Sequence, residues 1–149
     1  MDYSDLWNHG VLGEYDVGDP TFINLINYVL EKIPDEFEED FPTFCMYERK
    51  LEWCAYLDGE NNILLDVEEI KLQSKNTDNI IIGIIAEILA LLFIKAKIPN
   101  LRLVSVESLR TQAAQLASEW GFSDELEEYH KVLGSVTAFE LPIRPDIYG

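Results

Sequence analysis

The stretch that decides the fold reads Asp78-Asn-Ile-Ile-Ile-Gly-Ile-Ile-Ala-Glu-Ile-Leu-Ala-Leu-Leu-Phe-Ile-Lys95. From Ile80 to Ile94 it is apolar except for Gly83 and Glu87. A helix that is apolar on every face is buried, either in a protein core or in a membrane. A membrane span needs about 20 predominantly apolar residues, and a carboxylate near its centre is costly. This run is shorter and holds Glu87 near its middle, so it predicts a central core helix over residues 78–97.

The remaining composition predicts a single domain over residues 1–149 that folds without a metal or disulfides. A chain of this length buries roughly two thirds of the surface that its unfolded form exposes, and 48% of its residues are hydrophobic. Its first five residues are acidic and polar, without the apolar segment that secretory signals carry. We therefore expect a cytoplasmic protein, in which Cys45 and Cys54 are reduced thiols.

The chain is strongly acidic, because 28 Asp and Glu against 11 Lys and Arg give a net charge of -17. Such a surface repels nucleic-acid phosphates and anionic lipids, so we expect neither nucleic acid nor a membrane among its partners. A basic protein partner fits this charge, although solubility alone also explains it.

The densest acidic run comprises Asp35, Glu36, Phe37, Glu38, Glu39, Asp40 and Phe41. Our first interpretation is a solvated loop whose two Phe side chains turn down onto the core. The alternative is a docking patch for a basic protein partner.

Apolar spacing and turn residues predict the elements that precede the central helix. Asp19 and Pro20 have the features of a helix start, and Pro34 has those of a helix end. The run Asp58-Gly-Glu-Asn61 is typical of a hairpin turn. The predicted elements are an irregular arm over residues 1–19, a helix over 21–33, a small antiparallel sheet over 43–66 and a short helix or turn over 67–72.

The second half of the chain predicts two more helices and a tail. A helix over residues 106–120 would bury its apolar face, and the next would run from residue 123 to Gly134, with Gly121 as the stop between them. Expected caps of the last three helices are Asp78, Ser105 and Ser123. Residues 135–149 are expected to be extended.

This element order, with a second helix that closes on Trp120-Gly-Phe122, resembles small zinc metallopeptidases of the gluzincin type. Those enzymes carry His-Glu-x-x-His on a central helix, and a downstream helix supplies a third ligand, usually Glu. Two His residues at i and i+4 lie on one helical face and bind zinc, while the Glu takes a proton from the metal-bound water. The resemblance implies a zincin-like fold for roughly residues 50–130.

Laid on this sequence, the motif has lost its metal ligands. The two His positions read Ala86 and Ala90, while Glu87 occupies the position of the general base. The region where the third ligand is expected, residues 109–114, contains no acidic residue, and Glu107 lies about a turn early. Because alanine has no metal-binding atom, the resemblance implies a pseudo-metallopeptidase without zinc or another cofactor, which acts through protein binding.

Glu87 still needs partners, since an unpaired buried carboxylate is costly. We expect Glu87 to lie at the edge of the core and to reach solvent, a Lys or an Arg. The alternative is a remnant cleft with Glu87 at its floor. His130, on an acidic helix, is expected on the surface; with His9, Cys45 and Cys54 it would supply the ligands of any metal that the chain does bind.

The sequence therefore predicts an α+β domain, with helices around the central helix and a small antiparallel sheet. Three functions remain open: a non-catalytic zincin-like protein that binds other proteins, an acidic immunity-type or inhibitor protein that caps a basic partner, and a metal-dependent hydrolase with ligands that the motif does not reveal. A homodimer through the apolar helix or the hairpin edge is also compatible with the sequence.

Overall fold

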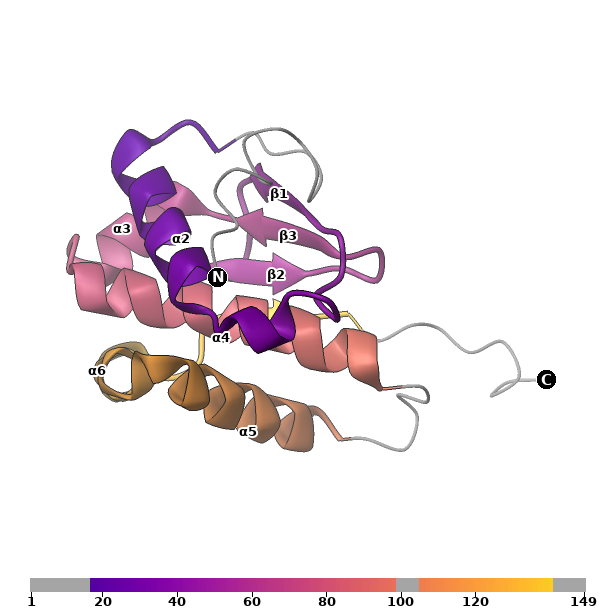
Figure 1. Ribbon diagram of the computed structural model, residues 1–149. Helices are drawn as coiled ribbons and strands as arrows, with labels where there is room; N and C mark the ends of the chain where they lie inside the picture. Colours follow the sequence, from indigo (N-terminus) through magenta and orange to yellow (C-terminus); the bar gives the residue numbers. More distant parts are fainter. Residues whose placement is uncertain (1–16, 99–104, 141–149) are drawn as a thin grey trace.

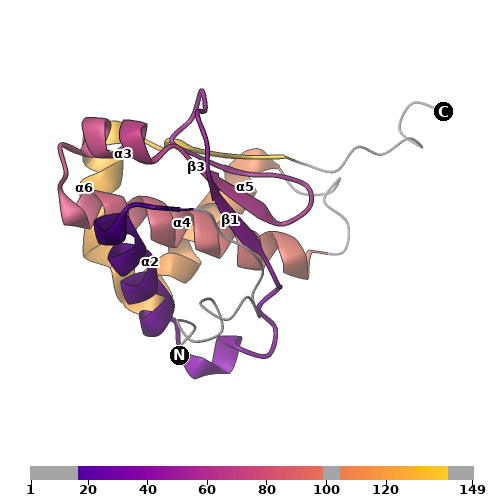
Figure 2. The same ribbon diagram turned by 90° about the horizontal axis from the view of Figure 1, so that it is seen from above.

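Helix α4 (Asp78–Lys97) lies at the centre of an α+β fold. The computed structural model describes residues 17–98 and 105–140. In Figure 1 the sheet, α2 (Pro20–Lys32) and α3 (Val67–Ser74) lie on one side of α4, and α5 (Val106–Ala117) and α6 (Ser123–Leu133) lie on the other. Seen from above, the strands run obliquely across α4 (Figure 2). The predicted fold class and the predicted central helix are confirmed.

The apolar character of α4 is explained by its position in the core. Every residue from Ile80 to Phe93 is buried. By length and composition α4 would be apolar enough to cross a membrane, but 83% of its most apolar window is buried within the protein, as in a core helix. Asp78 is not the cap, because Ile80 and Ile81 donate backbone hydrogen bonds to Thr77 and the helix therefore begins one residue earlier.

Gly83 lets α6 approach α4 very closely. A Cβ atom at this position would lie 2.7 Å from the carbonyl oxygen of Glu125 and 2.8 Å from Cβ of Tyr129. Only a residue without a side chain fits there, since real Cβ atoms keep a larger separation. This contact fixes which turn of α6 lies over the middle of α4.

The sheet contains the predicted hairpin and two further strands. Strands β2 (Ala55–Leu57) and β3 (Asn62–Leu65) pair antiparallel, and the Asp58 side chain accepts hydrogen bonds from the backbone of the turn. Strand β1 (Cys45–Glu48) pairs parallel with β3, and β4 (Thr137–Phe139) pairs parallel with β2, in the order β1-β3-β2-β4. The predicted small sheet is present, but it is mixed rather than antiparallel and gains β4 from outside residues 43–66, because the pairings β1–β3 and β2–β4 are long-range and parallel.

The remaining helix boundaries follow local chemistry. Asp19 caps α2 by accepting a hydrogen bond from Phe22 N at 2.8 Å, and Ser105 caps α5 by accepting one from Ser108 N at 3.1 Å. The acidic run opens with a short 3-10 helix, η1 (Asp35–Phe37).

At the α5–α6 junction the predicted stop at Gly121 is confirmed, but the predicted cap is not. A single π-helical turn, η3 (Ser118–Phe122), connects the two helices, and Gly121 turns the chain with a φ of 104°. Ser123 is already helical and is preceded by Phe122 at the cap position, so the expected Ser123 cap is wrong. The predicted end at Gly134 is confirmed, but the following residues form β4 rather than a free tail. The expected arm up to residue 16 and the tail after residue 140 lie outside the described residues.

Candidate functional site

Glu87 lies in the middle of α4 with 2% of its surface exposed, and its carboxylate accepts four side-chain hydrogen bonds. Its Oε1 atom accepts from Tyr129 Oη at 2.9 Å and Ser135 Oγ at 3.0 Å, and also from Thr137 Oγ1. Its Oε2 atom lies 2.5 Å from His130 Nε2. We call these five residues the Glu87 network.

Three elements place the donors of this network. The close approach at Gly83 brings the last turns of α6 over α4, so that Tyr129 and His130 face Glu87. Gly134, with a φ of 66°, ends α6 and turns the chain back toward the sheet. Strand β4 then pairs with β2, and this pairing brings Thr137, its first residue, and the preceding Ser135 to the same carboxylate.

The electrostatics favour an ionised carboxylate. Burial by itself raises the pKa of Glu87, but the hydrogen bonds from His130 and Thr137 and the charge of a protonated His130 outweigh burial, so that the pKa lies below its ordinary value. Burial, reinforced by the neighbouring Glu87, raises the pKa of Tyr129, which keeps the phenol protonated and able to donate. Glu87 is therefore an anion held by donors, not a free base.

A small hollow of about 260 Å³ opens beside the network, and we call it the Glu87 pocket. Its wall on α5 includes Arg110, whose Nη1 donates to Ser135 Oγ at 2.5 Å and whose guanidinium lies 5.6 Å from the Phe139 ring. The lining residues are Glu87, Arg110, Thr111, Ala114, His130 and Ser135. The stretch 109–114, which the resemblance assigns to the third metal ligand, thus faces Glu87.

Two expectations about this region were wrong. Glu87 does not lie at the edge of the core and reaches neither a Lys nor an Arg, because α6 and β4 supply its partners. His130 is not a free surface residue, since 35% of its side chain remains exposed and its ring contacts Glu87. Ala86 and Ala90 are fully buried. Their spacing places them on the same face of α4 as Gly83 and Glu87, the face that packs toward α5 and α6.

The described residues do not fit a zinc site. Within residues 17–98 and 105–140, no three His, Cys, Asp or Glu side chains lie together in a way that could hold a metal ion. His9 lies outside the described residues. Burial, with the charges of Glu69 and Asp66, raises the pKa of the Cys54 thiol to about 11, which disfavours the thiolate that a metal requires.

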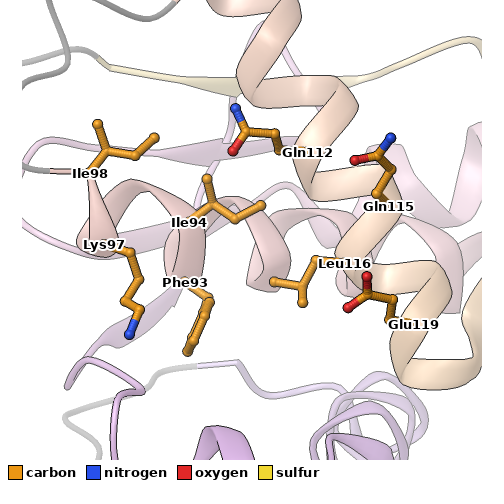
Figure 3. A pocket seen from close by; sticks show the side chains of 8 residues that line it. All are labelled: Phe93, Ile94, Lys97, Ile98, Gln112, Gln115, Leu116 and Glu119. Atoms are coloured by element: carbon orange, nitrogen blue, oxygen red, sulfur yellow. The ribbon is translucent and has the colours of Figure 1, made fainter.

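A second hollow, of about 310 Å³, lies between the end of α4 and α5, and we call it the α4–α5 groove. Figure 3 shows Ile94 of α4 and Leu116 of α5 pointing toward one another across this space. The lining residues are Phe93, Ile94, Lys97, Ile98, Gln112, Gln115, Leu116 and Glu119.

The acidic segment, residues 35–41, lies against a wall of this groove. The Phe37 and Phe41 rings lie 5.3 Å and 5.5 Å from the ring of Phe93, and both rings also pack against Trp120. Both Phe side chains therefore turn down onto the core, as expected. The five carboxylate residues of the segment are exposed, and their role as a docking patch stays a prediction.

Sequence reasoning missed four residues of the Glu87 pocket and its network: Arg110, Tyr129, Ser135 and Thr137. One signal could have pointed to them. A carboxylate in the middle of an all-apolar helix needs buried hydrogen-bond donors. The polar residues on either side of Gly134 are such donors, and they belong to the end of α6 and to the strand segment that folds back onto α4.

Comparisons with protein-family models, with curated proteins and with solved structures found no match for this chain.

Proposed function

We propose that the chain is a non-catalytic, zincin-like protein that acts through protein binding. The observation that carries the proposal is the set of four side-chain donors from the chain itself that hold the buried Glu87 carboxylate. Three side chains donate to Oε1 and His130 contacts Oε2, while only 2% of the residue is exposed. A general base must reach the water that it activates, whereas these donors hold Glu87 as an ionised structural clamp between α4, α6 and the segment that leads into β4.

The chemistry of the neighbouring positions supports the same conclusion. Alanine at positions 86 and 90 offers no ligand atom, and the region that the resemblance assigns to the third ligand presents Arg110 to the Glu87 pocket. A guanidinium is always protonated and cannot ligate a metal. Its positive charge would also repel a zinc ion in this pocket.

The catalytic half of the proposal is tested by titrating zinc into the chelator-treated protein by calorimetry, with hydrolysis of a fluorogenic casein measured in parallel. We expect no stoichiometric zinc binding and the same hydrolysis rate as in a blank without protein. Stoichiometric zinc binding together with hydrolysis that a chelator abolishes would overturn the proposal. That result would favour the metal-dependent hydrolase, with His9, His130, Cys45 and Cys54 as the ligands to test.

One observation also favours an acidic inhibitor that caps a basic protein, namely the exposed carboxylates of the acidic segment. The two functions differ in their response to salt. Capture of a basic protein by charge weakens steeply as ionic strength rises, whereas association through an apolar face does not.

A further inference from the structure

The α4–α5 groove has an apolar floor that is accessible between two helices. Phe93 and Leu116 are nearly buried, while Ile94 and Ile98 are only partly covered and pack against the core from outside. The volume of about 310 Å³ lies at the lower end of the range of roughly 300–1,000 Å³ that is typical of ligand pockets. The groove therefore suits one large apolar side chain better than an extended ligand.

The surroundings of the groove are acidic. Its rim carries Glu119, which is exposed. Lys97 also lies on the rim, but its ammonium group pairs with Asp40 at 2.8 Å, which offsets its charge. Glu38 and Glu39, next to Asp40 in the acidic segment, are exposed.

The acidic segment is held in place beside the groove. Phe37 and Phe41 flank the carboxylates and pack edge-on or tilted against Phe93, which is itself a wall of the groove. The backbone between them is therefore held next to an apolar hollow before any partner arrives. Such preorganisation lowers the entropic cost of binding.

From this combination we infer that the α4–α5 groove and the acidic segment together bind a basic protein segment that inserts one large apolar side chain. The groove receives the apolar anchor, and the exposed carboxylates of Glu38 and Glu39 face its Lys or Arg neighbours. Hot spots of protein interfaces have this form, with a buried anchor inside a polar rim. The net charge of -17 attracts such a segment at long range. The inference rests on the proposed function in protein binding and adds the site and the chemistry of the partner.

The test uses the full chain and short, fluorescein-labelled, Lys-rich peptides that carry a single central Leu, Phe or Trp. Matched probes replace the apolar residue by Ser, or all Lys by Glu. Fluorescence anisotropy gives the affinities, and methyl NMR shifts of Ile94, Ile98 and Leu116 locate the site. We expect saturable binding of an apolar-anchored Lys peptide, shifts at these methyl groups, and no binding of the Glu peptides.

Two pairs of charge-neutralising variants separate this site from general attraction to an acidic chain. Glu38→Gln with Glu39→Gln is expected to weaken binding roughly 3- to 10-fold, as the loss of two rim charges implies. The control pair, Asp124→Asn with Glu127→Gln, removes the same charge from exposed positions on α6. It should change the affinity less than about 2-fold, because screening limits the reach of surface charges.

A third variant, Gln115→Trp, narrows the groove from an exposed position without removing a core residue. It should abolish the advantage of the apolar-anchored peptide over its Ser counterpart. Equal losses in the two charge pairs, equal affinity for apolar and Ser peptides, or no saturable binding of any Lys peptide would each overturn the inference. None of these results depends on zinc binding or hydrolysis, so they leave the non-catalytic assignment to its own test.

Discussion

Replacing Glu87 by Gln is the perturbation that probes the Glu87 network most directly. The carboxylate oxygens accept from Tyr129, Ser135 and Thr137 on one side and from His130 on the other. Gln keeps one acceptor oxygen, but its amide nitrogen replaces the second oxygen, and the charge is lost. The change therefore weakens charge-assisted hydrogen bonds and removes the partner of the His130 ring.

The magnitude follows from burial and exposure. Hydrogen bonds to charged groups contribute about 1.5–3 kcal/mol each, against about 0.5–1.5 for neutral ones. Removing one partner of a buried pair costs roughly 3–5 kcal/mol, but a third of His130 is exposed and regains water. We therefore expect Glu87→Gln to lower the free energy of unfolding by about 2–4 kcal/mol at neutral pH, from the combination of these terms.

The pH dependence carries a definite sign. Because the folded pKa of Glu87 lies below its ordinary value of 4.5, the ionised carboxylate contributes its full stabilisation above pH 4.5. This stabilisation is lost as the pH falls through the folded pKa. The difference in unfolding free energy between the wild type and Glu87→Gln should therefore shrink below pH 4.5.

Urea unfolding, followed by circular dichroism between pH 3 and pH 7, measures the loss of unfolding free energy in Glu87→Gln and its dependence on pH. The control is Glu127→Gln on the exposed face of α6, which should change stability by less than about 0.5 kcal/mol. A Glu87→Gln variant as stable as this control, or a difference that does not change with pH, would refute the clamp. If Glu87 reached solvent, as the sequence suggested, Glu87→Gln would leave the free energy of unfolding nearly unchanged.

Three further predictions follow from the same structure. Gly83→Ala should destabilise the fold by about 1–3 kcal/mol, because its Cβ would lie 2.7 Å from the Glu125 carbonyl oxygen. The control is Gly59→Ala, whose Cβ would lie 3.8 Å from its nearest neighbours and should not meet this clash. Urea unfolding compares the stabilities of the two variants. Tyr129→Phe should cost about 1–3 kcal/mol by leaving buried hydrogen-bonding groups unpaired, and an equal stability would show that the phenol is dispensable. Cys54, with a thiol pKa of about 11 in a buried site, should resist iodoacetamide in the native protein and react after unfolding, as mass spectrometry can measure.

The central part of the fold was accessible to sequence reasoning because its signals are local. An apolar run from Ile80 to Ile94 has one stable environment in a small domain, and the turn at residues 58–61 determines the antiparallel pairing of β2 with β3. Caps were predicted less well. The expected cap at Asp78 failed because Asp78 is already the first helical residue and Thr77 occupies the cap position.

The missed features depend on distant segments. The parallel pairs β1–β3 and β2–β4 join strands that no short turn connects, so nothing local fixes their register. The contact between Glu87 and His130 arises because Gly83 allows α6 to lie against α4. Because Glu87 and His130 lie on separate helices, no spacing motif in the sequence connects them. The acidic neighbours of His130 also favoured the interpretation that it lies on the surface.

Zinc binding distinguishes a Glu87 that the chain's own donors hold from a Glu87 that can act as a general base. The NMR signal of its side-chain carboxyl reports on its ionisation and on zinc binding. We would record the ¹³C NMR signal of the Glu87 carboxyl at pH 5, with and without one equivalent of zinc. The account predicts an ionised carboxylate, because its pKa lies below 4.5, and a signal that zinc does not move. A protonated carboxyl at pH 5, or a shift on adding zinc, would contradict the claim that the chain's own donors hold Glu87 as a structural anion.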